Sequence, residues 1–197
     1  DLRVAFIAVG GMGGAHVKEM VDLGVTCTCF ADVDTRHWGN ATKHWPNAKG
    51  YQDYRQMFDK EAKNFDAVMI ATPDHHHYPA TILAMQAGKH VYTQKPLTHT
   101  VWEARQLTEA AKKYKVVTQM GNQGHAGEGW RKVYEWIRSG AIGHVKEVHT
   151  WTDRPIWPQG MERPQEEDPV PSTLNWDVWI GPAPMRPYKK DCYHQFA

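Results

Sequence analysis

The sequence has no block of like charges and no long apolar run, and each absence narrows the class of protein. The 197 residues carry a formal net charge of +1, with no five like charges in a row, so charge gives no reason to expect a nucleic acid or an anionic membrane as partner. No run of eighteen apolar residues and no leader with an apolar centre precedes the first predicted strand, so we expect a soluble chain without a membrane span. We expect a cytoplasmic protein by default; an exported, periplasmic one requires that a signal was removed before Asp1.

Cysteines are few, and the bulk composition is that of an ordinary globular chain. Of the three cysteines, Cys27 and Cys29 lie two positions apart in a predicted strand. Both should therefore point to the same face, where they cannot readily pair with each other. We interpret them as small core residues. With 41% apolar and 23% charged residues, the chain is long enough for one substantial domain and part of another.

Strand and helix signals alternate through the first part of the sequence, which is typical of parallel βαβ units. We therefore predict an α/β fold with a doubly wound parallel sheet of the Rossmann type. The expected strands cover 3–8, 26–31, 66–71, 90–93 and 116–120, and the expected helices cover 15–23, 34–45, 53–58, 78–87 and 101–114.

The character of the sequence changes after Gly121. We predict a dinucleotide-binding Rossmann domain over 1–121 and the start of a truncated second α+β domain over 122–197. In the latter we expect a helix over 130–138 and a strand over 145–152.

Prolines and tryptophans dominate the stretch 155–187. So proline-rich a stretch cannot be regular helix or central strand, and we interpret it as an extended arm that packs by its aromatic side chains. The alternative is that Trp151, Trp157, Trp176 and Trp179 stack on sugar rings.

A glycine-dense turn, Ala8-Val9-Gly10-Gly11-Met12-Gly13-Gly14, joins the first predicted strand to the first helix. Such a turn lets the backbone approach a pyrophosphate, and the helix that follows offers unpaired N–H groups and the positive end of its dipole. Gly10 and Gly13 hold the second and third places of a G-x-G-x-x-G fingerprint. Ala8 holds the first place, which is tolerable only if the turn needs no positive φ there.

Asp32 ends the second predicted strand, 22 positions after Gly10. An acidic residue at about this distance hydrogen-bonds the adenosine ribose and repels a 2′-phosphate, which favours NAD over NADP. The alternative interpretation is that Asp32 is a helix N-cap or turn residue.

Three further strand ends carry chemically useful side chains. They are Thr72-Pro73-Asp74 with His75, His76 and His77; Gln94-Lys95-Pro96; and Gly121-Asn122-Gln123 with His125. Ligands of open parallel sheets bind beyond the carboxyl ends of the strands, so we expect these ends to converge on one crevice. Consecutive histidines cannot easily direct three imidazoles at one ion, so we predict no metal site. We expect His77 to face the cofactor, and His75 and His76 to lie near the cleft or in solvent.

The glycine turn with His16, the Thr72-Pro73-Asp74 run that reaches His77, the segment Ala87-Gly88-Lys89-His90-Val91-Tyr92 and Lys95-Pro96 resemble the Gfo/Idh/MocA oxidoreductases. That family includes glucose-fructose oxidoreductase and inositol dehydrogenase. Segments 120–125, 157–160 and 176–184 resemble one bacterial branch of it, whose members are often exported proteins of polysaccharide-degrading bacteria.

The resemblance implies a role for each matching residue. The cofactor-binding set is Gly10, Gly11, Met12, Gly13, Asp32, Thr72, Pro73, His77, Gln94 and Asn122. Thr72, Pro73 and His77 would line the nicotinamide side. Lys95 corresponds to the lysine of the family's Glu-Lys-Pro motif, whose ammonium can stabilise the oxygen of a carbinol as hydride leaves its carbon, and can share a proton with it if burial lowers its pKa. Gln94 replaces the usual glutamate, which removes a negative charge beside Lys95.

The implied function is an NAD-dependent oxidoreductase that transfers hydride between a carbohydrate or cyclitol carbinol and nicotinamide, with a small sugar-like molecule as its partner. The family's Asp and His, which act as acid and base on the sugar, have no counterpart here. We therefore expect an amino-terminal fragment of a longer enzyme, or a variant that binds without full catalysis. Two alternatives stay open: a glycoside hydrolase that uses transient oxidation and elimination, and a stand-alone NAD-binding domain. The oligomeric state is not predicted.

Overall fold

The computed structural model of the chain describes residues 2–153, 162 and 164–193. The chain divides into two compact units, one of Asp1–Gly121 with Glu167–Ala197 and one of Asn122–Glu166. Within the described part, none of the helices has the length and apolar character that a membrane crossing requires.

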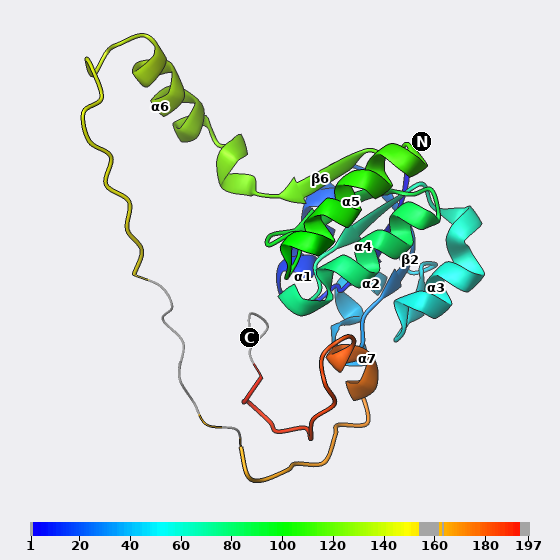
Figure 1. Cartoon of the computed structure of the whole chain (residues 1–197). Coiled ribbons are helices and arrows are strands. Elements are labelled where there is room, and N and C mark those ends of the chain that lie inside the picture. The colour runs from blue at the N-terminus through cyan, green and yellow to red at the C-terminus, as the bar shows by residue number, and fades with distance from the viewer. Residues whose placement is uncertain (1, 154–161, 163, 194–197) are drawn as a thin grey trace. The chain divides into compact units, whose positions relative to one another are not determined.

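Strands and helices alternate along the first unit (Figure 1). Its elements are β1 (Arg3–Ile7), α1 (Gly11–Asp22), β2 (Thr26–Ala31), η1 (Thr35–His37), α2 (Gly39–Thr42), β3 (Lys49–Tyr51), α3 (Tyr54–Glu61), η2 (Ala62–Asn64), β4 (Ala67–Ile70), η3 (Asp74–His76), α4 (His77–Gln86), β5 (His90–Gln94), α5 (Val101–Tyr114), β6 (Thr118–Gly121) and α7 (Trp176–Ile180), where η marks a 3-10 helix.

The strands form one parallel sheet in the order β3-β2-β1-β4-β5-β6, which confirms the predicted doubly wound fold. The sheet has six strands instead of the five predicted, because the sequence interpretation missed β3 at its edge. β3 is only three residues long and has Gly50 in its middle, so it gives no alternation signal.

Helices cover both faces of the sheet. On one face, residues of α3, α4 and α5 such as Met57, Ala80 and Leu107 pack against the strands. On the other face, Val17 of α1 and Ala41 of α2 do so. The predicted helix over 34–45 is divided into η1 and α2, which agrees with the low helix propensity of Gly39 at its middle.

Cys27 and Cys29 are buried core residues, but they lie on opposite faces of the sheet. Cys27 belongs to the cluster on the α1 side and Cys29 to the cluster on the α3 side. The prediction of a common face was wrong because the pairing of β1 with β2 shifts by one residue between these cysteines, and such a shift reverses the side-chain alternation. Burial raises the pKa of Cys27 to about 12 and that of Cys29 to about 11.

The second unit contains η4 (Gln123–Ala126) and α6 (Glu128–Arg138). Residues 145–152 form no strand, contrary to the prediction. A strand needs a hydrogen-bonded neighbour, and no described strand pairs with this stretch. On α6, the large apolar side chains are exposed; they are Trp130, Val133, Tyr134, Trp136 and Ile137.

Residues 167–193, which we name the C-terminal segment, belong to the first unit. The segment contains one helix, α7, where the sequence predicted only an extended arm. The five residues of α7 include no proline, and the Asn175 side chain caps its start by accepting a hydrogen bond from Val178 N at 3.2 Å. Trp157 and the rest of 157–160 lie outside the described residues.

Candidate functional site

A cavity of about 560 Å³ lies at the carboxyl ends of the strands, a size typical of small-molecule sites. Its strand-end wall includes these predicted site residues: Gly10, Gly11, Met12, Asp32, Thr72, Pro73, His77, Gln94 and Lys95. Gly13 and Asn122 are not among the lining residues. Gly13 is buried in α1, and Asn122 begins the second unit. Two of the three predicted strand ends, those at Thr72 and Gln94, thus line one cavity, whereas the third, at Gly121, contributes no lining residue.

The glycine turn is tightly packed at two of its glycines. A Cβ on Gly13 would lie 2.2 Å from the Ala8 carbonyl oxygen, and a Cβ on Gly10 would lie 2.5 Å from His37 Nδ1. Gly10 is the N-cap of α1 and offers no side chain to its first N–H groups. The sequence predicted that alanine is tolerable at position 8 only without a positive φ. Ala8 has a φ of +70°, so that condition is not met, and Ala8 adopts a conformation that favours glycine.

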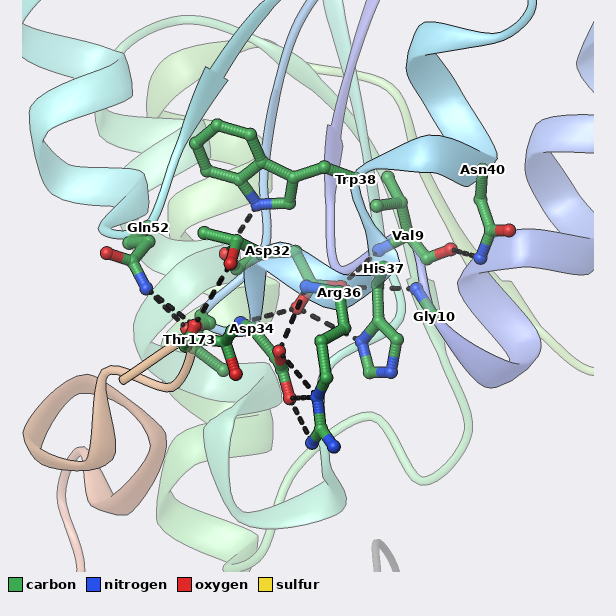
Figure 2. A network of polar contacts seen from close by, with 12 residues as sticks. Val9, Gly10, Asp32, Asp34, Arg36, His37, Trp38, Asn40, Gln52 and Thr173 are labelled. Atoms are coloured by element: carbon green, nitrogen blue, oxygen red, sulfur yellow. Dashed lines mark hydrogen bonds and ion pairs between the residues drawn. The ribbon is translucent and has the colours of Figure 1, made fainter. Parts of the chain in front are cut away.

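Asp32 is buried between this turn and the loop that follows β2 (Figure 2). Its Oδ2 accepts hydrogen bonds from Val9 N at 2.9 Å and Gly10 N at 3.1 Å, and its Oδ1 accepts one from Asp34 N at 3.0 Å. A carboxylate has about four lone-pair sites, so most of its acceptor capacity already shapes the turn. Asp32 is therefore a turn residue as well as an acidic wall of the cavity.

The loop after Asp32 carries an ion pair and a histidine that line the cavity. Arg36 Nη2 lies 2.5 Å from Asp34 Oδ2. Burial alone would raise the pKa of Asp34, but the hydrogen bonds from Arg36 outweigh it and hold the pKa below its usual value. His37 Nδ1 lies 3.4 Å from Asp32 Oδ1, and this contact raises the pKa of His37.

Thr72 and His77 stand together at the end of β4. Thr72 Oγ1 is buried and has no hydrogen-bond partner within the described part of the chain. His77 is buried, with Nε2 at 2.9 Å from the Thr72 carbonyl oxygen and Nδ1 at 2.5 Å from the Pro96 carbonyl oxygen. His77 lines the cavity and also ties the loop after β4 to the loop after β5.

His75 and His76 lie beside the C-terminal segment. His75 Nε2 is 2.9 Å from the Trp179 carbonyl oxygen. His76 is buried, lines the cavity, and has its Nε2 3.1 Å from Tyr54 Oη. Burial and the nearby His75 lower the pKa of His76 to about 4.

Gln94, at the end of β5, links Lys95 to α1. His16 Nδ1 lies 3.1 Å from the Glu19 carboxylate, so this nitrogen donates and Nε2 is left to accept. Gln94 Nε2 donates to His16 Nε2 at 2.5 Å, and Gln94 Oε1 accepts from Lys95 N at 3.2 Å. A glutamate carboxylate could not donate the first bond. The departure from the family's Glu-Lys-Pro pattern therefore suits the partner that position 94 has in this chain.

Lys95 lines the cavity beyond the end of β5, and it is exposed. The described residues thus place it beside the predicted cofactor site without burying it. Between residues 2 and 193, apart from the positions that the structure leaves undescribed, no group of three or more His, Cys, Asp or Glu side chains is arranged to hold a metal ion.

The C-terminal segment provides a second wall of the cavity, which the sequence interpretation missed. It contributes Leu174, Trp176, Val178, Trp179, Tyr188, Lys189, Asp191 and Tyr193. The signal was the density of aromatic residues after Leu174 together with the proline-free stretch 174–181, which is compatible with a short helix.

The residues of the cavity fit a dinucleotide. Gly10, Gly11 and Met12 line the cavity, so the backbone at the start of α1 is open to a pyrophosphate. Asp32 supplies the acidic group that suits the ribose hydroxyls of NAD. The unpaired hydroxyl of Thr72 offers a further polar contact. NAD would supply hydride chemistry when bound.

A parallel sheet in this strand order, with a glycine turn after β1 and an acid after β2, defines a dinucleotide-binding Rossmann protein. The comparison with protein families agrees. A model described as "Oxidoreductase family, NAD-binding Rossmann fold" matches residues 2–122, and one described as "Oxidoreductase family, C-terminal alpha/beta domain" matches residues 133–197. The chain belongs to the Gfo/Idh/MocA oxidoreductase family and carries its NAD-binding domain.

The similar proteins include a glycosyl hydrolase and inositol dehydrogenases. A glycosyl hydrolase family 109 protein of Shewanella pealeana is 29% identical over 154 residues, which is 73% of this chain and 33% of that protein. An inositol 2-dehydrogenase of Salmonella paratyphi B is 26% identical over 75% of this chain and 45% of its own. The crystal structure of myo-inositol 2-dehydrogenase from Lactobacillus plantarum superposes with a TM-score of 0.66 at 28% identity, over 72% of this chain and 42% of that one. The chain thus spans between a third and a half of the length of these relatives.

Proposed function

We propose that the protein transfers hydride between a ring carbinol of a carbohydrate or cyclitol and NAD. The observation that carries the proposal is a single cavity that joins the glycine turn and Asp32 to Thr72, His77 and Lys95. Similarity to inositol 2-dehydrogenases supports the substrate class. The activity belongs to the whole protein, of which this chain carries the cofactor-binding part.

Each proposed residue has a distinct task. Gly10 to Gly13 would hold the pyrophosphate at the start of α1, and Asp32 the adenosine ribose. Thr72, Pro73 and His77 would line the nicotinamide side. Gln94 would fix the backbone of Lys95 through the bond from Lys95 N to its Oε1. Asn122, which begins the second unit, is a further proposed cofactor contact.

Lys95 is the proposed catalytic residue. Oxidation of a carbinol removes hydride from carbon and a proton from oxygen, and an ammonium that hydrogen-bonds the oxygen stabilises the charge that develops there. The exposed position of Lys95 in the cavity wall leaves its side chain able to reach a substrate. The resemblance assigns the proton itself to an Asp and a His of the second domain.

The test is the Lys95→Ala substitution in the full protein. We expect kcat for NAD reduction by a cyclitol or sugar to fall about 100-fold to 10,000-fold, the range typical of a lost acid or base group, while NAD affinity changes little. Lys112→Ala is the matched control, because Lys112 pairs with Glu109 on the surface of α5 and lines no part of the cavity. Unchanged turnover in Lys95→Ala would remove Lys95 from the mechanism.

A second candidate is hydrolysis of a glycoside by transient oxidation at the ring and elimination of the substituent, with NAD restored in each cycle. The similarity to a glycosyl hydrolase family 109 protein favours it. Both candidates use the same cofactor cavity, so they differ in their products. Release of an aglycone from a chromogenic glycoside without accumulation of NADH would support the hydrolase, and NADH formation in proportion to substrate would support the dehydrogenase.

A further inference from the structure

The C-terminal segment is fastened to the loop that follows the ribose-binding position. Thr35 N donates to the Thr173 carbonyl oxygen at 3.0 Å, and Asn175 N donates to the Val33 carbonyl oxygen at 2.9 Å. The side-chain amide of Gln52 donates to the carbonyl oxygens of both Val33 and Thr173, at 3.0 and 2.9 Å (Figure 2). These bonds join Thr173 and Asn175 to Val33 and Thr35, which follow Asp32 by one and three positions.

An aromatic cluster follows this attachment point and faces the cavity. Trp176 stacks on Trp179 with ring centroids 4.8 Å apart and an angle of 15° between the planes. Tyr188 packs edge-on against Trp176 at 5.3 Å, and Trp176 Nε1 donates to the Arg186 carbonyl oxygen at 2.8 Å. Tyr193 packs against Trp176 as well, with ring centroids 5.3 Å apart. All four rings line the cavity, so the cluster presents an apolar surface that its own ring contacts hold in place.

Arg36 also lines this cavity. Three hydrogen bonds between its side chain and Asp34 hold the guanidinium, with Nε and Nη2 at 2.5 to 3.0 Å from the carboxylate oxygens. The hydrogen bond to Asp34 raises the pKa of Arg36, and the nearby Tyr188 adds to that effect. Arg36 and Tyr188 both line the cavity, and a planar base can stack on a guanidinium or an aromatic plane.

We propose that the C-terminal segment completes the adenosine pocket, with the adenine base of NAD lying against Trp176 and Tyr188. This inference rests on the NAD site of the proposed function and adds to it residues from the far end of the chain. Adenine offers two flat π faces and no charge, which suits an aromatic wall. The segment would then contact the adenosine half of the cofactor beside the loop that follows β2.

The sheet order separates this pocket from the reacting centre. Asp32 follows β2 and Lys95 follows β5, with β1 and β4 between them. At about 4.8 Å from strand to strand, the two ends are roughly 14 Å apart. A substrate carbinol has to lie beside Lys95, so the part of the segment that is fastened to the β2 loop stands on the adenosine side.

Hydrogen exchange on the unmodified protein tests the proposal without a substitution. ADP-ribose carries the adenosine half of NAD, and nicotinamide mononucleotide carries the other half. We expect saturating ADP-ribose to slow amide exchange over 173–181 at least about 10-fold, and nicotinamide mononucleotide to leave it unchanged. Helix α6, in the other unit, is the internal control. Equal protection by the two probes, or protection by a sugar alone, would overturn the assignment to adenine.

Substitutions then identify the side chains. Trp176→Ala and Tyr188→Ala should each weaken ADP-ribose about 10-fold in calorimetric titration, the effect of one lost base-stacking contact, and leave nicotinamide mononucleotide affinity unchanged. Trp176→Phe should bind ADP-ribose within about 3-fold of the unmodified protein, because a stacking plane remains. Trp102→Ala is the matched control, since Trp102 lies exposed on α5 outside the cavity.

Two failures are distinguishable. If the unmodified protein binds neither NAD nor ADP-ribose, the proposed function fails. If it binds both, and Trp176→Ala and Tyr188→Ala bind ADP-ribose as tightly as it does, only the role of the C-terminal segment is overturned.

Discussion

The two walls of the cavity are built differently. The strand-end wall is held by hydrogen bonds from buried polar side chains. Asp32 fixes the turn around Gly10, and His77 fixes the loop at Thr72. The wall of the C-terminal segment is aromatic, and it is attached by a few backbone bonds such as that from Asn175 N to the Val33 carbonyl oxygen. The strand-end wall therefore forms together with the sheet, whereas the wall of the C-terminal segment docks onto the finished sheet.

His76, at the junction of the two walls, should give the largest effect. Its pKa is lowered from the usual 6.5 to about 4 by burial, so the folded state resists its protonation while the unfolded state does not. Its contribution to stability is complete above pH 6.5 and is lost as the pH falls to 4, by about 3 kcal/mol in total. Urea unfolding at several pH values measures this.

The comparison between variants isolates His76 from other groups that titrate in the same range. His76→Gln should flatten the difference in unfolding free energy between pH 6.5 and 4, whereas His44→Gln, at an exposed position of the same unit, should leave it unchanged. Identical pH profiles for His76→Gln and the unmodified protein would mean that protonation does not disturb the junction.

Gly13 tests the strand-end wall. Because a Cβ there would lie 2.2 Å from the Ala8 carbonyl oxygen, Gly13→Ala should force α1 away from the turn and lower the free energy of unfolding by about 2 kcal/mol. Chemical denaturation provides the measurement. Gly39→Ala is the control, since nothing lies within 4 Å of a Cβ at that position; equal losses in the two variants would contradict the close approach.

Ala8 should give the smallest effect, and one of opposite sign. With a φ of +70°, Ala8 carries a left-handed strain of about 1–2 kcal/mol, and glycine would relieve it at a cost of about 0.5–1 kcal/mol in unfolded-state entropy. Ala8→Gly should therefore raise the free energy of unfolding by about 0.5 kcal/mol, as measured by the urea midpoint. A destabilised Ala8→Gly protein would show that the turn tolerates alanine without strain.

The strand-end wall could be predicted because its signals are local. The helix 101–114 has the predicted bounds, and its start is a capping box in which Thr100 Oγ1 accepts from Glu103 N at 3.2 Å and the Glu103 side chain accepts from Thr100 N at 2.9 Å. The succession of a strand, a glycine turn and a helix is likewise specified by residues close together in the sequence. The glycine turn and the strand ends at Asp32 and Thr72 follow from such signals. Arg36, His37 and Gln52, which also line the cavity, were not predicted.

The docked wall could not be predicted, because its position depends on contacts between residues far apart in sequence. Gln52 and Thr173 are 121 positions apart, and no pattern around either residue specifies the bond between them. The register shift in β2 could not be predicted for a related reason. The sequence interpretation assumed that side chains alternate along the whole strand, whereas the pairing of Ala5 with Cys29 interrupts the alternation. Both features depend on which residue pairs with which, and the secondary-structure propensity of a residue does not specify its partner.

The register shift in β2 has a consequence for how this site can change. Before the shift, Cys27 faces the α1 layer; after it, Cys29 and Ala31 face the α3 layer. The two halves of the strand are thus out of phase, and the second half delivers Asp32 to the N–H groups of Val9 and Gly10. Loss of the one extra residue, Thr28, would restore simple alternation with Cys27 and Asp32 on the sides that they now occupy. We therefore expect deletion of Thr28 to leave Asp32 at the proposed cofactor site, because the pairing of β1 with β2 from Ala5 onward does not use the extra residue.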